Sequence, residues 1–247
     1  MATKKTLLIL GATSAIAQQV ARQVVSRDYR IILVGRDRQK LVDLCADLQV
    51  RGGTADYRVH DLLEMTAHEQ IIKNVVNEYG GFDIVLLAYG TLPDQEQCEA
   101  DRNEAVKQLN INFISAQNIL SVIAERFIEQ GQGQIIAISS VAGDRGRKSN
   151  YIYGAAKGAL SIYLQGLRNR LSAHNVQVLT VKPGFVDTPM TKDFKKGILW
   201  STPERVAKDI VRAMDKRRDV IYTPWFWKYI MLIIKFIPET IFKKLNL

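Results

Sequence analysis

The sequence is poor in cysteine and histidine. Among its 247 residues there are two cysteines, Cys45 and Cys98, and three histidines, His60, His68 and His174. Two cysteines so far apart in the chain exclude a disulfide framework and a zinc–cysteine site, and they favour a reducing, cytoplasmic compartment. Because the histidines show no metal-ligand spacing, we expect each of them at the surface or in a loop and predict no metal site.

Long apolar runs are also missing. No stretch of about 20 uninterrupted apolar residues is present, which excludes an ordinary transmembrane helix. The amino-terminal run 7–10 is too short for the core of a secretory signal. With 47 % hydrophobic and 24 % charged residues, the composition is that of a globular protein. Because no linker or repeat is visible, we predict one catalytic domain over residues 1–224 and a carboxy-terminal extension over residues 225–247.

The positive charge is concentrated near the carboxyl end. The net charge is +9, and the segment 192–247 holds 13 of the 34 Lys and Arg but only 6 of the 25 Asp and Glu. A nucleic-acid-binding protein usually spreads its basic residues along a recognition element, so no nucleic-acid partner is expected. A basic tail rich in Trp, Phe, Ile and Leu favours an anionic membrane surface or an anionic substrate.

Short apolar runs alternate with longer amphipathic stretches along the chain. Runs of strand length lie at 6–10, 30–34, 55–59, 84–88, 134–138, 177–181 and 220–222, and helical spacing is found at 14–26, 38–49, 67–79, 105–130, 151–174 and 204–216. Strands that are apolar throughout are typical of a parallel sheet covered on both faces. The sequence therefore predicts an α/β fold: a doubly wound Rossmann-type sheet in a three-layer sandwich.

The first predicted strand runs into the small-residue turn Gly11-Ala12-Thr13-Ser14-Ala15-Ile16-Ala17 and then into a helix. Such a turn lets backbone N–H groups at a helix amino terminus approach a pyrophosphate. An ordinary strand–helix turn is the alternative.

The second strand is followed by Gly35-Arg36-Asp37. An arginine at this point suits the 2′-phosphate of NADPH, whereas an acid suits the ribose hydroxyls of NADH. We therefore predict NADPH, with NADH and a plain solvated turn as alternatives. Asp61, just past the third strand, either meets the edge of the adenine ring or caps the next helix.

A serine pair and a Tyr-x-x-x-Lys motif carry the chemistry. Ser139 and Ser140 end the fifth strand, and Tyr153 and Lys157 share one face of the following helix. A lysine ammonium beside a phenol lowers the pKa of the tyrosine below its ordinary value of ~10, so that the phenol can exchange a proton with a carbonyl substrate. A serine hydroxyl can hold the carbonyl oxygen. Chance pairing on a helix is the alternative.

With these motifs in this order, residues 4–225 resemble the short-chain dehydrogenase/reductase family. The family's catalytic serine lies 13 residues before its tyrosine, which selects Ser140, and its catalytic asparagine matches Asn112 rather than Asn110. The resemblance implies an NAD(P)H-dependent carbonyl reductase and a homo-oligomer. It implies the catalytic residues Asn112, Ser140, Tyr153 and Lys157. It implies cofactor contacts from Gly11, Thr13, Ser14, Ala15, Ile16, Arg36, Asp61, Leu62, Ala88, Tyr89, Gly90, Tyr153, Lys157, Pro183, Gly184, Val186 and Thr188.

The sequence departs from the family pattern at two places. Ala15 and Ala17 stand where the family's turn has glycines, and Leu87-Ala88-Tyr89-Gly90 replaces the usual Asn-Asn-Ala-Gly. Both changes predict weaker cofactor binding. They leave a non-catalytic, membrane-associated dinucleotide sensor or scaffold as an alternative, which the intact catalytic set disfavours.

Several further segments resemble the decaprenylphosphoryl-2-keto-erythro-pentose reductases: 88–92, the basic stretch 144–148, 220–225 and the tail 236–245. This resemblance implies reduction of the 2-keto group of a polyprenyl-phosphate-linked pentose, the second step of a ribose-to-arabinose epimerisation in cell-wall or glycan synthesis. A flavin-dependent oxidase partner makes the ketone. Other apolar carbonyl compounds, such as 3-oxoacyl, steroid or retinoid substrates, are alternatives.

The tail fits such a substrate. Residues 225–237 are apolar except for Lys228 and Lys235, which share one helical face. A helix of this length spans roughly 20 Å, short of the ~30 Å hydrocarbon core, so we expect it to lie in the interface on the inner face of the cell membrane. Packing as a subunit contact or as a lid is the alternative. A basic rim for the phosphate is predicted from Arg145, Arg147, Lys148, Lys195 and Lys196.

Overall fold

The computed structural model describes residues 4–245 as alternating strands and helices. The strands are β1 (Thr6–Leu10), β2 (Arg30–Gly35), β3 (Thr54–Val59), β4 (Ile84–Leu87), β5 (Gly133–Ile138), β6 (Val176–Pro183) and β7 (Val220–Thr223). The α-helices are α1 (Ala15–Val24), α2 (Arg38–Val50), α3 (His68–Tyr79), α4 (Gln95–Ala100), α5 (Arg102–Leu109), α6 (Ser115–Gln130), α7 (Tyr151–Leu171), α8 (Pro203–Asp215), α9 (Trp227–Phe236) and α10 (Glu239–Phe242). Short helical turns are η1 (Met65–Ala67), η2 (Asn110–Ile114), η3 (Val141–Asp144), η4 (Ser172–His174) and η5 (Pro189–Thr191).

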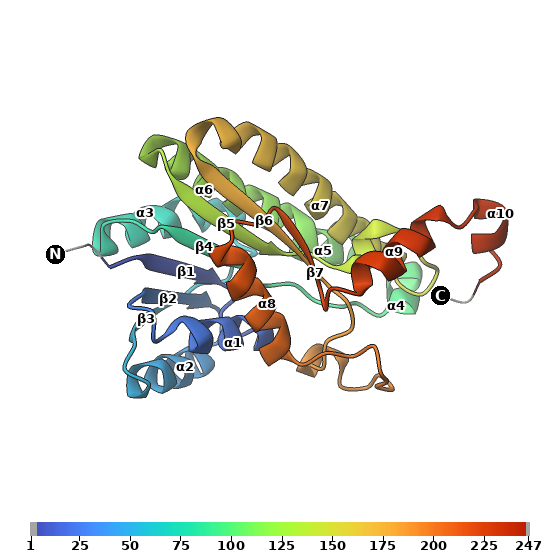
Figure 1. Cartoon of the computed structure of the whole chain (residues 1–247), viewed down its shortest axis with the longest axis horizontal. Helices are drawn as coiled ribbons and strands as arrows, with labels where there is room; N and C mark the ends of the chain where they lie inside the picture. The colour runs from blue at the N-terminus through green and yellow to red at the C-terminus, as the bar shows by residue number, and fades with distance from the viewer. Residues whose placement is uncertain (1–3, 246–247) are drawn as a thin grey trace.

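The strands form one parallel sheet in the order β3-β2-β1-β4-β5-β6-β7. The chain builds outward from β1 to β3 and then crosses back to β4, so the winding direction reverses between β1 and β4. In open α/β sheets, ligands bind at the carboxyl ends of the strands beside this reversal. Figure 1 shows α1, α2 and α8 on one face of the sheet and α3, α6 and α7 on the other. The predicted three-layer Rossmann-type fold is confirmed.

The central strands are apolar along their whole length because helices cover both faces of the sheet. In β1, Leu7 and Ile9 pack into the core beneath α1, α2 and α8, while Leu8 and Leu10 pack into the core beneath α3, α6 and α7. All five residues of β1 are buried. A strand at the centre of such a sandwich has no polar face, which is why its sequence shows no alternation.

The long helical stretch predicted over 105–130 is confirmed, but it is not one regular α-helix. The structure has two α-helices, α5 and α6, joined by one π-helical turn at Asn110–Ile114. A π turn accommodates an extra residue in the helix, and such turns are frequent at functional sites. The six-residue α4 was not predicted either, although Asp94 caps it with its carboxylate.

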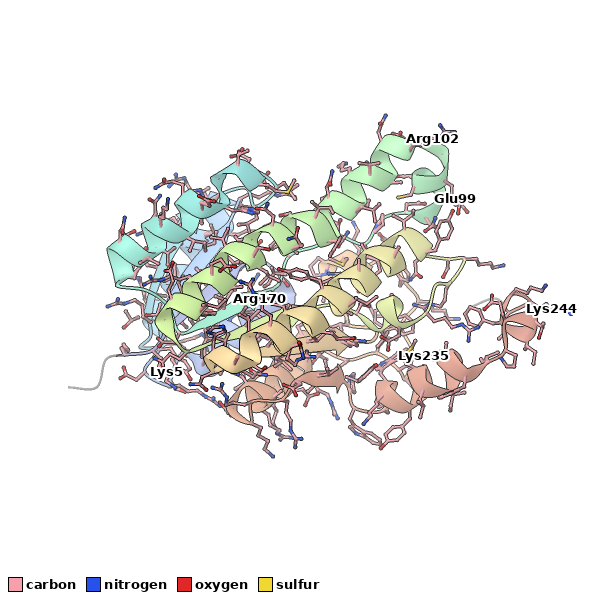
Figure 2. All side chains as sticks on the ribbon, turned by 90° about the horizontal axis from the view of Figure 1, so that it is seen from above. Lys5, Glu99, Arg102, Arg170, Lys235 and Lys244 are labelled. Carbon is pink, nitrogen blue, oxygen red and sulfur yellow. The ribbon has the colours of Figure 1, made fainter. Side chains whose placement is uncertain are left out.

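The tail forms α9 and α10 beyond the last strand. Trp227 and Met231, one turn apart on α9, are buried against Val141 of η3, while most of the remaining apolar side chains of α9 stay exposed. Figure 2 places Lys235 and Lys244 of this tail at the same end of the molecule as Glu99 and Arg102, away from Lys5. No helix among residues 4–245 combines the length and the apolar character needed to cross a bilayer. The domain boundary after residue 224 stays a prediction.

Candidate active site

The predicted site residues lie in the connections that follow the carboxyl ends of the strands. Gly11 follows β1, Arg36 follows β2, Tyr89 follows β4 and Ser140 follows β5. Because parallel strands end at one edge of the sheet, residues from distant parts of the sequence meet there.

The glycine turn brings β1 and β4 into close contact. Gly11 has φ +82°, and a Cβ added there would lie 2.6 Å from the Cβ of Tyr89. Only glycine fits this backbone and this approach. Ser14 precedes α1 without capping it through its side chain, so the helix amino terminus is left for another acceptor. Both observations fit the pyrophosphate of a dinucleotide, for which Gly11, Thr13, Ser14, Ala15 and Ile16 remain the predicted contacts.

The two charged residues in the turn after β2 differ in their contacts. The Asp37 carboxylate caps α2 by accepting a hydrogen bond from the Lys40 N–H at 3.1 Å, and it pairs with the Lys40 ammonium at 3.2 Å. These contacts with Lys40 lower the pKa of Asp37. Arg36 is exposed and makes no hydrogen bond or ion pair with any described residue. The acid is therefore engaged in the helix cap, while the guanidinium is available for a phosphate.

Asp61 closes the turn after β3 and caps neither η1 nor α3, so the capping alternative is wrong. Its Oδ1 accepts a hydrogen bond from the N–H of Leu63 at 3.0 Å. Leu62 is buried, and its carbonyl accepts from Nε2 of His68 at 2.9 Å. His68 is fully buried, so the prediction that all three histidines lie at the surface or in loops is wrong.

The catalytic serine and tyrosine of the sequence analysis meet in the structure. Ser140 lies close enough to Tyr153 to act on the pKa of the phenol, and its Oγ accepts from the N–H of Ala142 at 3.1 Å. Its neighbour Ser139 bonds instead to the Lys157 carbonyl at 3.0 Å and to Ser161 at 2.8 Å, inside the protein. The geometry therefore favours Ser140 over Ser139 as the residue that faces a substrate.

Asn112 and Lys157 approach each other across Gly90. A Cβ added at Gly90, where φ is +154°, would lie 2.7 Å from Asn112 Oδ1 and 3.3 Å from Lys157 Nζ. The π turn aims Asn112 inward, where its Oδ1 accepts from the N–H of Thr91 at 3.1 Å. Lys157 Nζ donates to the Ile138 carbonyl at 3.2 Å and lies 5.8 Å from the centre of the Tyr153 ring. The four predicted catalytic side chains are thus brought to one place.

The pKa values of this group differ from the expected ones. Burial raises the pKa of Tyr153 to about 12, and the nearby Ser140 hydroxyl opposes this only in part. Burial lowers the pKa of Lys157 to about 8. The predicted lowering of the tyrosine pKa is therefore wrong for this structure. The reason is that desolvation of the phenol dominates, while the ammonium donates to a backbone carbonyl rather than to the phenol.

The family model described as short chain dehydrogenase matches residues 5–198 of this chain. The chain belongs to the short-chain dehydrogenase family. It is 30 % identical over 97 % of its length to a protein of Mycobacterium tuberculosis named "uncharacterized oxidoreductase", covering 96 % of that relative. A Streptomyces coelicolor protein with the same description is 30 % identical over 98 % of this chain and 96 % of its own length.

Solved structures of other family members show the same fold. A gluconate 5-dehydrogenase from Burkholderia cenocepacia, in complex with NADP and tartrate, superposes with a TM-score of 0.82 at 19 % identity, covering 91 % of this chain and 95 % of that one. An actinorhodin polyketide ketoreductase with NADPH gives 0.82 at 21 % identity, covering 92 % and 99 %. The protein is therefore a short-chain oxidoreductase.

This short-chain oxidoreductase closes its site with the segment after β6. Gly184 lies directly beneath Trp227 of the tail, because a Cβ added at Gly184 would come within 1.9 Å of the indole Nε1. Pro183 and Val186 are buried, and the N–H of Thr188 donates to Thr191 Oγ1 at 3.1 Å. The tail thus packs on Gly184, a predicted cofactor contact, and this contact fits the lid alternative of the sequence analysis.

Tyr89 stands at the alanine of the family's Asn-Asn-Ala-Gly pattern. Its hydroxyl lies 2.8 Å from Ser115 Oγ, which in turn is hydrogen-bonded to the Leu62 carbonyl. Burial raises the pKa of Tyr89. Tyr89 therefore ties the end of β4 to α6 and to the turn after β3, while the N–H of Ala88 donates to the Leu10 carbonyl of β1.

A buried ion pair, which the sequence analysis missed, holds the serine loop to β6. Lys182 Nζ lies 2.5 Å from Asp144 Oδ1, and the Tyr222 hydroxyl donates to Asp144 Oδ2 at 2.7 Å. The one available signal was a lysine near the end of a mostly apolar strand.

The predicted basic rim is only partly free for a ligand. Arg145 clamps the tail: its guanidinium donates to the carbonyls of Ile234 at 2.5 Å and Ile237 at 2.7 Å, and it packs 3.7 Å from the centre of the Phe242 ring. Lys196 is paired with Asp187. The Arg145 guanidinium is therefore used to hold the tail, and the expectation that it faces a phosphate is wrong. The Lys196 pair is exposed to solvent, and its role toward a phosphate stays a prediction.

Proposed function

We propose that this short-chain oxidoreductase is an NADPH-dependent carbonyl reductase whose substrate is a lipid-linked 2-keto pentose. The observation that carries the reductase assignment is the meeting of Ser140, Tyr153, Lys157 and Asn112 at the edge of the sheet beside the uncapped amino terminus of α1. The reduced dinucleotide supplies a hydride when it is bound. The exposed Arg36 favours the 2′-phosphate of NADPH over NADH.

The side chains then have distinct tasks. The Ser140 hydroxyl holds the carbonyl oxygen, and Tyr153 donates its proton to that oxygen as the alcohol forms. With a pKa of about 12, the phenol is protonated at neutral pH, which is the form that reduction needs. Lys157, with a pKa of about 8, is mostly charged at neutral pH and stabilises the developing negative charge on the phenol.

A single substitution tests this assignment. Tyr153→Phe removes the proton donor and keeps the ring, so turnover should fall by about 10²–10⁴-fold while NADPH still binds. Tyr163→Phe on the same helix is the matched control, because that hydroxyl only contacts Ser121 and the Gln117 carbonyl. Turnover by Tyr153→Phe at the wild-type rate would refute the assignment. The absence of wild-type turnover with any carbonyl compound would favour the sensor or scaffold instead.

The lipid part of the proposal is supported by the tail. Its apolar side chains are largely exposed, with Trp225 at 66 %, Ile233 at 67 % and Phe236 at 79 %. The tail also carries lysines that face solvent, including Lys228 and Lys235. An apolar surface fringed by cations fits the interface of an anionic membrane, where a polyprenyl substrate would be found.

Sedimentation with vesicles tests the membrane contact. The protein should bind vesicles that contain anionic phospholipid and bind neutral ones less. Replacing Ile233 and Phe236 by serine should lower the bound fraction by about tenfold or more, because two large side chains no longer enter the interface. Ile162→Ser, at an equally exposed position on α7, is the control. The double variant could bind vesicles like the wild type, or it could lose a homo-oligomer rather than vesicle binding. Either result would assign the exposed apolar side of the tail to contact with a second copy of this chain.

The substrate itself is tested with a polyprenyl-phosphate pentose and a flavin-dependent oxidase that supplies the ketone. NADPH consumption that requires both would support the epimerisation step in cell-wall or glycan synthesis. Consumption with 3-oxoacyl, steroid or retinoid ketones alone would favour those substrates.

A further inference from the structure

The loop over residues 145–150 joins two parts of the active site. It follows η3, which begins directly after Ser140, and it leads into α7, which carries Tyr153 and Lys157. The N–H of Ile152, just beyond the loop, donates to Gln95 of α4, so the start of α7 is anchored to α4. The loop therefore connects the turn that holds Ser140 with the helix that holds Tyr153 and Lys157.

The two arginines of the loop differ sharply. Arg145 satisfies its guanidinium with tail carbonyls and with Glu239 at 2.9 Å. Arg147 is half-buried, its Nε is sealed from solvent without a partner, and it forms no ion pair with any acid among residues 4–245. Burial lowers the pKa of Arg147, and no neighbouring carboxylate opposes that shift. A desolvated cation without a counter-charge is costly and rare in proteins.

The same turn contains a buried hydrogen-bond acceptor that has no donor. Oδ1 of Asn150 is also sealed without a partner, three residues after Arg147, in a turn closed by the Asn150 N–H and the Arg147 carbonyl at 3.1 Å. Buried polar atoms are normally hydrogen-bonded. The donor Nε of Arg147 and the acceptor Oδ1 of Asn150 both lack a partner in this turn. A ligand that supplies one hydrogen-bond acceptor and one donor would satisfy both atoms. An oxyanion that also bears hydroxyl groups has that chemistry.

We propose that Arg147 binds the anionic group of the substrate, with Asn150 accepting a hydrogen bond from one of its hydroxyls. The inference rests on the proposed function of the site as a carbonyl reductase, and it specifies the substrate class: a hydroxylated carbonyl compound that carries a phosphate or a carboxylate. A guanidinium provides two parallel donors for such a group. Neutral ketones such as steroids leave this cation unpaired.

Equilibrium binding to the NADPH-loaded protein tests the role of Arg147. The probes are farnesyl phosphate, farnesoate and farnesol, used below their micellar concentrations, and they share one chain but differ in the head group. Wild-type protein should bind at least one anion about tenfold or more tightly than farnesol. Arg147→Gln should weaken the binding of that anion by about 10- to 100-fold and change the dissociation constant of farnesol by less than about twofold.

Arg126→Gln is the matched control. Arg126 also has a sealed Nε without a partner, but its guanidinium pairs with Glu129 on α6, outside the loop 145–150. This variant should bind all three probes like the wild type. Among the outcomes, preference for farnesyl phosphate supports a phosphate-bearing substrate, and preference for farnesoate supports a carboxylate-bearing one. Equal binding of farnesol and both anions, or anion binding that survives in Arg147→Gln, would overturn the inference.

A stability measurement separates this role from a structural one. Because Arg147 has no partner in the chain, Arg147→Gln should unfold at the wild-type temperature or above it, since loss of an unpaired buried cation relieves its desolvation. A clear drop in unfolding temperature would contradict the inference. Binding does not require turnover, so a protein that binds the anion through Arg147 but reduces no carbonyl would refute the proposed function and leave this inference standing.

Discussion

The ion pair between Lys182 and Asp144 determines how firmly the serine loop is held to the sheet. The two side chains are 10 % and 2 % exposed, their charged atoms are 2.5 Å apart, and Tyr222 donates to the second carboxylate oxygen. Lys182→Met keeps the aliphatic stem but leaves the carboxylate buried beside one neutral donor. Removing one partner of a buried pair costs about 3–5 kcal/mol. For a chain of this length, that corresponds to a fall of about 6–20 °C in unfolding temperature.

Thermal and urea unfolding of the full-length protein measure this cost. The double variant with Asp144→Asn and Lys182→Met should recover part of the loss, because no charge is then left unpaired in the interior. Lys107→Met removes an exposed pair with Glu104 and should change stability by less than about 1 kcal/mol. A loss below about 1 kcal/mol for Lys182→Met would mean that Asp144 is solvated, and the reasoning from burial would fail.

Three further predictions concern the catalytic group and the tail. Gly90→Ala should cut turnover by about 100-fold or more, because the new Cβ displaces Asn112, and steady-state kinetics will show whether it does. As pH rises through about 8, Lys157 loses its proton, so kcat/KM for reduction should fall. In Lys157→Arg this fall should move to higher pH. If the pH profile of kcat/KM is the same in the variant, Lys157 has no part in the mechanism. Arg145→Met should release α9 and α10, seen as faster hydrogen exchange and proteolysis in the tail with little change elsewhere; unchanged protection would show that the packing of Trp227 suffices.

The strands and most helices could be predicted because the residues that the hydrophobic pattern places inside are the ones that the fold buries. Every predicted strand lies within a residue or two of its observed bounds, since most are apolar runs ended by glycine or a polar turn. The edge strand β3 is the exception, because Asp56 and Arg58 alternate with its less polar residues. His68 was misplaced although a signal existed. It precedes Ile71, Ile72 and Val75 at helical spacing, so it belongs to the buried face of α3.

The candidate catalytic residues come from motifs, but their geometry could not be predicted. A continuous helical pattern over 105–130 gives no sign of the π turn at Asn110–Ile114, because such a turn reflects tertiary contacts around Asn112 rather than propensity. The pKa of Tyr153 was misjudged for a related reason. The four-residue spacing to Lys157 places both on one helix face, but the direction in which the ammonium points is set by the Ile138 carbonyl.

The basic stretch 144–148 shows why sequence alone could not assign these charges. In the sequence Arg145, Arg147 and Lys148 form one cationic patch suited to a phosphate. In the structure Arg145 reaches acceptors some 90 residues away in the tail and becomes part of the fold, whereas Arg147, two residues later, finds none. Only the long-range contacts separate the two arginines. The residue that the fold leaves unsatisfied is the one that a ligand can complete, so the structure narrows a general electrostatic expectation to one guanidinium beside the catalytic serine loop.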